Sequence, residues 1–253
     1  MTERRFSCRE GVYPSWQDAV RLLPEAGVRG IEINQRPPQE LDPLAAGVRA
    51  GGLEVTSLST HVDLDSDDSV TAYVAQLEAA GRLGIGVVFT SASGRGREST
   101  WYMHRLADLA DEADMRGVVM ALETHPPFCM NADTMLGTIS AIDRPNVGVN
   151  FDTANIYYYN RGLDSADQLA KVAQHVVSLH LKDTDGGYES FEFPVLGQGV
   201  VDFPRIFAIL DEAGFDGPLT LELEGPITSG KSLQERHEAV LACMEYLRSI
   251  GVA

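Results

Sequence analysis

Long apolar runs are missing from this sequence. No stretch of about 18 apolar residues, the minimum for a membrane-spanning helix, occurs, and the first residues, MTERRFSCREG, lack the apolar core of a secretory signal. Cysteine is scarce as well: Cys8, Cys129 and Cys243 lie far apart and form no CxxC pair. This spacing argues against a disulfide framework and against a zinc knuckle. We therefore expect a soluble, cytoplasmic protein with reduced thiols and no membrane partner.

Positive charge is also in short supply. Lys and Arg number 20 against 37 Asp and Glu, which gives a formal net charge of −17. Such a chain repels a phosphate backbone at long range, and this argues against nucleic acid or an anionic membrane as a partner.

Four segments share one pattern, in which a helix end is followed by a Gly-containing turn and an apolar run: EAGVRGIEIN, RLGIGVVFTS, ADMRGVVMALETH and EAGFDGPLTLELEG. Extending this pattern predicts eight strands, near 5–9, 28–34, 53–61, 86–91, 117–125, 147–152, 176–182 and 219–224. Amphipathic runs such as WQDAVRLLPEAG and FPRIFAILDEAG, which have helical spacing, lie between them. Eight alternating units in 253 residues predict a single-domain (β/α)8 TIM barrel over residues 1–253.

Alternate positions along the last four predicted strands differ in polarity. One face is apolar, for example Met120 and Leu122, and it should pack against the helices. The opposite face carries acids, histidines and a lysine at the carboxyl ends of the strands: Glu123 and His125, Asn150 and Asp152, His180 and Lys182, Glu222 and Glu224. Strands buried on both faces are usually apolar throughout, and barrel enzymes build their active sites at this end. The pattern therefore predicts an active site.

Glu123, Asp152, His180 and Glu222 are the first strongly polar inward residues of these four strands. Carboxylates packed around one point repel one another unless a cation lies between them. Three oxygens and one imidazole nitrogen suit one divalent ion such as Mn2+, Mg2+ or Co2+, and Zn2+ is less expected without thiolates. The alternative is a buried polar network without a metal.

The segments MALETH, NFDTAN, HLKD and GQGVVDFPRIFAILDEAGFDGPLTLELEG resemble the xylose isomerase-like barrels, a superfamily of sugar isomerases and epimerases that includes inosose dehydratases and AP endonucleases. The resemblance implies that Glu123, Asp152, His180 and Glu222 bind one divalent metal, Mn2+ being the most favoured. It also implies that Glu123 and Glu222 act as acid and base, and it favours Glu222 over Glu224 as the ligand. A homodimer is compatible with the resemblance.

One position departs from the family pattern. Many members read Asp-Thr-x-His where this chain has Asp152, Thr153, Ala154 and Asn155. A histidine that a trinuclear zinc site of the endonuclease type would use is thus missing, and a single metal is favoured.

Further polar residues are candidates for substrate binding: His61, His125, Asn155, Tyr157, Lys182 and Glu224. Each has a structural alternative, such as packing at the rim or bracing a ligand. Aromatic rings with phenolic tips suit sugars, which present C–H patches beside hydroxyls. The loop 183–199 could close over the site as a lid, and 91–100 could bind a phosphate or be a plain flexible loop.

The leading hypothesis is proton transfer next to a carbonyl, through an enediolate, on an unphosphorylated keto-sugar or cyclitol. Return of the proton gives an epimerase or an isomerase. Loss of a β-substituent from the same enediolate gives a dehydratase or lyase acting on an inosose or 3-keto-glycoside. A non-catalytic sugar-binding subunit and an AP endonuclease-like hydrolase are the less favoured alternatives.

Overall fold

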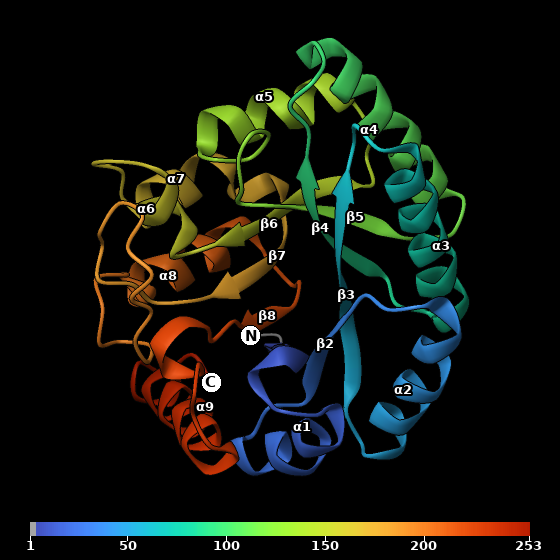
Figure 1. The fold of residues 1–253 in the computed structure, drawn as a ribbon. Coiled ribbons are helices and arrows are strands. Elements are labelled where there is room, and N and C mark those ends of the chain that lie inside the picture. The colour runs from blue at the N-terminus through green and yellow to red at the C-terminus, as the bar shows by residue number, and fades with distance from the viewer. Residues whose placement is uncertain (1–3) are drawn as a thin grey trace.

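The structure, a computed structural model, describes residues 4–253. Within these residues eight parallel strands close into a barrel in chain order, and helices surround it (Figure 1). The strands are β1 (Phe6–Arg9), β2 (Gly30–Asn34), β3 (Glu54–Asp63), β4 (Val87–Ser93), β5 (Val119–Glu123), β6 (Val147–Asp152), β7 (Val176–Leu181) and β8 (Leu219–Leu221). Each pairs with the next, and β8 pairs with β1. The predicted (β/α)8 barrel is confirmed.

The helices are α1 (Trp16–Leu22), α2 (Pro38–Ala50), α3 (Asp67–Leu83), α4 (Ser99–Asp114), α5 (Ala132–Ile142), α6 (Asn155–Tyr159), α7 (Ser165–Val172), α8 (Phe203–Ala213) and α9 (Leu233–Ser249). The Gly turns of the sequence pattern end α3 and α8. Gly84 has φ 67° and Gly214 has φ 70°, a left-handed conformation in which glycine carries no steric penalty. No helix within residues 4–253 is long and apolar enough to cross a membrane.

The core lies between the barrel and its helices. The outward residues predicted from parity, among them Leu122, Phe151 and Leu179, are at most 1% exposed and belong to one apolar cluster that also includes helix residues. Burial of each such side chain contributes about 1.5–3 kcal/mol. Polar residues of the same strands face the barrel interior. The outward face of each strand therefore stabilises the fold, and the inward face is available for chemistry.

The eighth strand is shorter than expected. It was predicted over 219–224 and ends at Leu221. The amide of Glu222 still donates to the carbonyl of Leu181 at 3.2 Å, but the chain then turns at Gly225, where φ is 68°. Glu222 and Glu224 therefore lie just beyond the sheet, at the carboxyl end of the barrel.

Candidate active site

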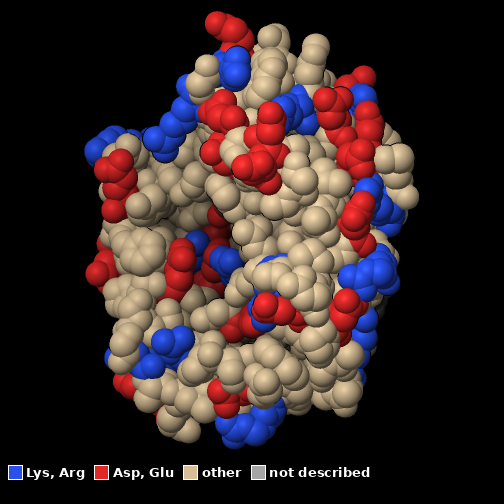
Figure 2. Space-filling view, turned by 45° about the vertical axis from the view of Figure 1, so that its right-hand side comes forward, with Lys and Arg blue, Asp and Glu red and all other residues tan. Residues whose placement is uncertain are grey.

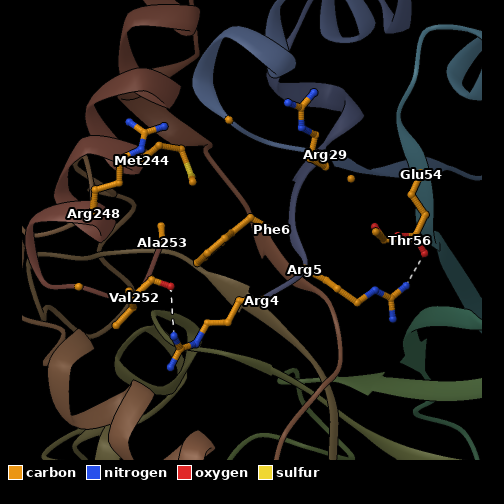
Figure 3. A pocket seen from close by; sticks show the side chains of 13 residues that line it. Arg4, Arg5, Phe6, Arg29, Glu54, Thr56, Met244, Arg248, Val252 and Ala253 are labelled. Carbon is orange, nitrogen blue, oxygen red and sulfur yellow. Dashed lines mark hydrogen bonds and ion pairs between the residues drawn. The ribbon is translucent and has the colours of Figure 1, made fainter. Parts of the chain in front are cut away.

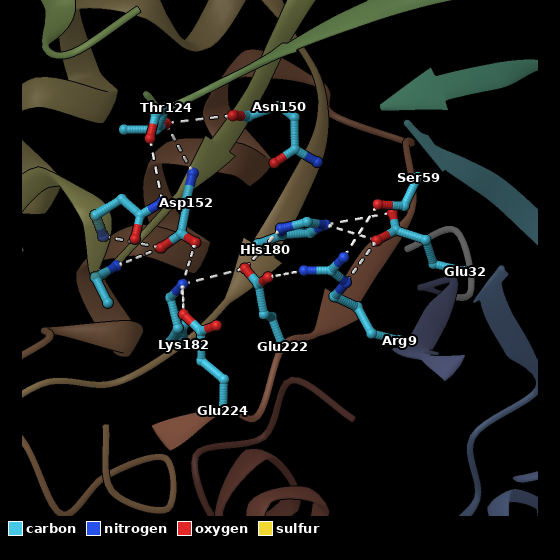
Figure 4. A network of polar contacts seen from close by, with 12 residues as sticks. Arg9, Glu32, Ser59, Thr124, Asn150, Asp152, His180, Lys182, Glu222 and Glu224 are labelled. Carbon is cyan, nitrogen blue, oxygen red and sulfur yellow. Dashed lines mark hydrogen bonds and ion pairs between the residues drawn. The ribbon is translucent and has the colours of Figure 1, made fainter. Parts of the chain in front are cut away.

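Acidic and basic side chains meet in a hollow at the carboxyl ends of the strands (Figure 2). A cavity of about 330 Å³ opens there. Its lining comes from β1 to β5 and the loop after β2: Arg9, Asn34, Gln35, Ser59, Thr60, His61, Phe89, Ser91 and Glu123. Figure 4 shows the polar network beside it, in which residues of β1, β2 and β3 meet residues of β6, β7 and the chain after β8.

Asp152 is fully buried at the end of β6. Its Oδ1 accepts the backbone N–H groups of Ala154 and Asn155 at 2.8 and 2.9 Å, which ties it to the start of α6. The hydroxyl of Thr124 accepts the Asp152 amide at 2.9 Å. Oδ2 points the other way and, among the described residues, accepts no hydrogen bond, although Nζ of Lys182 is 2.9 Å away. One carboxylate oxygen thus holds the start of α6, and the other faces the ammonium group of Lys182.

His180 lies between two carboxylates. Its Nδ1 is 2.9 Å from Oε2 of Glu222, and its Nε2 is 3.2 Å from Oε1 of Glu32. The ring of Phe89 stacks on it with centroids 4.8 Å apart. Burial alone would lower the pKa of His180, but Glu32 and Glu222 raise it to about 10.

Glu222 has three basic neighbours. Besides His180, Oε1 is bonded to Nη1 of Arg9, and Oε2 is 3.2 Å from Nζ of Lys182. Burial would raise the pKa of Glu222, but these three neighbours hold it well below its usual range. The carboxylate is ionised and tightly held.

Glu123 stands apart from the other three predicted ligands. Ligand atoms of Asp152, His180 and Glu222 lie within 4.8 Å of one another, and Glu123 is not in that group. It lines the cavity instead, where burial raises its pKa. The sequence thus predicted a four-residue set, and the structure brings three of them together with the fourth at the cavity wall.

The three converging residues fit a divalent metal ion. Their ligand atoms lie within 4.8 Å of one another, close enough to share one ion, and Nδ1 of His180 and Oε2 of Glu222 form a hydrogen-bonded pair at 2.9 Å. Glu32 can hold the other ring nitrogen of His180, as carboxylates commonly do beside metal-bound histidines. Oδ2 of Asp152, which faces Nζ of Lys182 at 2.9 Å, would supply the third ligand.

Two basic side chains already neutralise part of this cluster, a feature that the sequence argument for a metal did not include. Lys182 contacts Asp152 and Glu222, and it also reaches Oε1 of Glu224 at 2.8 Å. Arg9, at the end of β1, contacts Glu32 and Glu222. Applying the same parity rule to β1, where Ser7 and Arg9 share the inward face, would have found Arg9.

The charges still favour a dication. Four buried carboxylates, those of Glu32, Glu123, Asp152 and Glu222, face two cations, those of Arg9 and Lys182. Without a metal, a protonated His180 reduces the excess of negative charge among these groups to one. With His180 neutral, as a metal ligand would be, the excess is two, and a divalent ion would cancel it.

Comparison with known proteins agrees with the barrel fold. A family model described as xylose isomerase-like TIM barrel matches residues 20–250. The chain belongs to this family. It is 24% identical over 250 residues to the inosose dehydratase of Histophilus somni (strain 129Pt), covering 83% of each chain.

Solved structures share the fold of this xylose isomerase-like barrel. D-psicose 3-epimerase from Clostridium cellulolyticum H10, solved with D-tagatose, has a TM-score of 0.77 at 14% identity, with 97% of this chain and 99% of that chain covered. The IOLI protein with a bound zinc atom has a TM-score of 0.78 at 19% identity, with 97% of each chain covered.

The remaining predicted site residues differ in their surroundings. His61 lines the cavity, and the half-buried His125 packs edge-on against Tyr159 with centroids 5.1 Å apart. Asn155 donates through Nδ2 to the carbonyl of Thr124 at 3.1 Å and so braces the ends of β5 and β6.

Tyr157 points to other partners. Its hydroxyl donates to Asp164 at 2.9 Å and accepts the amide of Ser165 at 3.3 Å, at the start of α7. The hydroxyl of Tyr157 is therefore engaged at the start of α7 and does not lie at the cluster of Asp152, His180 and Glu222.

Another cavity, of about 640 Å³, lies at the opposite, amino-terminal end of the barrel (Figure 3). Its arginines diverge. Arg4 donates to the carbonyl of Val252, Arg5 to Glu54 and Arg248 to the carbonyl of Ala26. Its basic groups do not converge on one point, unlike the groups at the carboxyl end.

Asp183 organises the loop beside the site. It is the last residue of the HLKD segment, and no role was predicted for it from the sequence. It is fully buried, and its two oxygens accept the amides of Thr184, Gly197, Gly199 and Val201 at 2.8–3.1 Å. A Cβ at Gly199 would lie 2.3 Å from Oδ1 of Asp183, so the loop can close on the carboxylate only with glycine there.

Asp183→Asn should destabilise the protein by about 2–4 kcal/mol, because an amide nitrogen would face backbone donors in place of an accepting oxygen. Thermal unfolding should show a Tm lower by about 5–10 °C, and limited proteolysis should cut within 184–200. Asp185→Asn, an exposed position in the same loop, is the control. A Tm unchanged within about 1 °C would show that the loop does not depend on this carboxylate.

Proposed function

We propose that this protein is a metal-dependent isomerase or epimerase that transfers a proton next to the carbonyl of an unphosphorylated keto-sugar or cyclitol. The observation that carries the proposal is the position of one glutamate in the cavity wall and of a second beside the cavity lining. Glu123 lines the cavity from β5, and Glu222, just beyond β8, contacts Arg9 of that lining. Asp152 and His180 complete a divalent metal site with Glu222.

Each residue has a distinct task in this proposal. A bound divalent ion, most favourably Mn2+, would acidify the C–H next to the carbonyl and stabilise the negative charge that develops there. Glu123 and Glu222 remove and return the proton. The rigid contacts of Asp152 with α6 and of His180 with Glu32 keep the ligands in place.

An uncharged substrate is favoured by the charges of the site. With a dication bound, the buried carboxylates are balanced by Arg9, Lys182 and the ion, so a substrate phosphate would add negative charge without a counterion. The amides of Arg95 and Gly96, in the loop considered for phosphate binding, donate instead to Asp65 at 2.7 and 3.1 Å. Both observations support a neutral sugar or cyclitol.

A dehydratase is the second candidate. It is favoured by the similarity to an inosose dehydratase over 83% of the chain. The same proton abstraction, followed by loss of a β-hydroxyl from the enediolate, gives this outcome. The residues that act are the same, and the product distinguishes the two reactions.

Solvent exchange tests the proposal. The metal-loaded protein is incubated in D2O with ketoses, inososes and 3-keto-glycosides, and NMR follows deuterium at the carbon next to the carbonyl. We expect exchange with at least one substrate, its loss on chelation and its recovery with Mn2+, with dehydration products revealing a lyase. Tight sugar binding by calorimetry without exchange would instead identify a binding subunit, and cleavage of abasic DNA would identify a repair enzyme.

A further inference from the structure

The guanidinium group of Arg9 contacts residues of β2, β3 and β4 and a residue just beyond β8. Nε of Arg9 is 3.3 Å from Oε1 of Glu32, at the register position opposite it on β2. Nη1 donates to Oε1 of Glu222, and Nη2 donates to Oγ of Ser59 at 3.0 Å. The ring of Phe89 on β4 lies 5.7 Å away. The group is thereby fixed in orientation from several sides (Figure 4).

Arg9 nevertheless keeps donors for a ligand. A guanidinium carries five N–H bonds. Its hydrogen bonds with the described residues use one N–H on Nη1 and one on Nη2, while Nε faces Glu32 as an ion pair. One N–H on each Nη remains. The side chain is 26% exposed, and it lines the cavity together with Glu123 and His61. A residue that served only to neutralise Glu222 would not need to face this cavity.

We propose that Arg9 has two roles in the active site: it positions Glu222 through Oε1, and its two remaining N–H groups bind an oxygen of the substrate. This inference rests on the proposed function and adds a specificity determinant to it. The contacts to Glu32 and Glu222 already balance the charge of Arg9. The substrate oxygen that Arg9 binds is therefore that of an uncharged hydroxyl or carbonyl group. Because a guanidinium group only donates hydrogen bonds, this oxygen must act as the acceptor.

The first test replaces Arg9 by methionine and by lysine, with a substrate that the wild type exchanges. Arg9→Met should lower kcat/KM by about 100-fold or more, because charged hydrogen bonds to both Glu222 and the substrate are lost. Arg9→Lys restores the charge without the planar fork and should recover only part of the loss. Arg36→Met is the matched control, since Arg36 also pairs with a carboxylate, that of Glu10, but does not line the cavity.

The second test separates substrate binding from support of Glu222. A series of substrates is prepared in which one oxygen at a time is removed. One deoxy compound should react about 10- to 100-fold more slowly than the parent with the wild type and within about threefold of the parent with Arg9→Met. If every deoxy compound loses the same factor in both proteins, Arg9 does not contact the substrate and the inference is wrong.

Failure of the proposed catalytic function can be distinguished from failure of the inference about Arg9. If the wild type exchanges no substrate, the same series is measured by calorimetry with Mn2+ present, and the selective loss for one deoxy compound should appear in Kd. Selective loss in Kd would support Arg9 in a binding protein and refute catalysis. Absence of any sugar binding would refute both.

Discussion

Glu222→Gln should reduce solvent exchange into the substrate by about 1,000-fold or more, within the range for loss of a general acid or base and with a further loss from the metal site. The substitution keeps the shape but removes the charge that Arg9, His180 and Lys182 surround. Arg9 and Lys182 would then each lose one of their carboxylate partners, and the amide would be a poor metal ligand. NMR of the exchange reaction, together with metal content by emission spectroscopy, measures both effects.

Two companion variants define what this loss means. Glu212→Gln, on the exposed face of α8, should react like the wild type. Glu123→Gln should lose exchange by about 100- to 10,000-fold but retain the ion, because Glu123 is outside the three-residue group. If Glu222→Gln exchanges at the wild-type rate, the proposed role of this carboxylate is wrong. If Glu123→Gln loses the metal, Glu123 is a fourth ligand of the ion.

The sequence predicted the barrel and the convergence of Asp152, His180 and Glu222 because both depend on short-range periodicity. Alternation along a strand decides which side chains face inward, and Met120 and Leu122 pack outward while Asp152 and His180 face inward. The carboxyl ends of parallel strands then meet at one end of the barrel. These relations hold without knowledge of exact distances.

Arg9 could not be placed as easily, since its importance depends on barrel closure. It belongs to the first strand, and its partner Glu222 lies 213 positions later in the chain. Only the pairing of β1 with β8 brings them together. Likewise, Tyr157 was expected at the site, but α6 begins at Asn155 and turns the Tyr157 hydroxyl toward Asp164, a rotation that depends on the local helix and not on the strand.

Asp152→Asn should weaken binding of the divalent ion by at least about 100-fold, more than the 10- to 100-fold typical of a residue that only orients a ligand. The asparagine oxygen can still accept the amides of Ala154 and Asn155, so α6 should keep its start. The lost charge comes from Oδ2, the buried atom that accepts no hydrogen bond among residues 4–253. The variant therefore keeps the contacts of Oδ1 with α6, and it removes the charge of Oδ2 together with its ion pair to Lys182.

Thermal unfolding gives an independent measure of this loss. Mn2+ at about 100 times its Kd stabilises the folded wild type by about 2.7 kcal/mol, which corresponds to a rise in Tm of about 5–10 °C. Asp152→Asn should show almost none of this rise at the same Mn2+ concentration, while Asp108→Asn, exposed on α4, should show all of it. If the wild type gains no stability from Mn2+, Mg2+, Co2+ or Zn2+, Lys182 holds Asp152 and Glu222 permanently and the cluster is a polar network without a metal. If Asp152→Asn responds like the wild type, the ion binds elsewhere, because the cluster would have lost a charge without losing affinity.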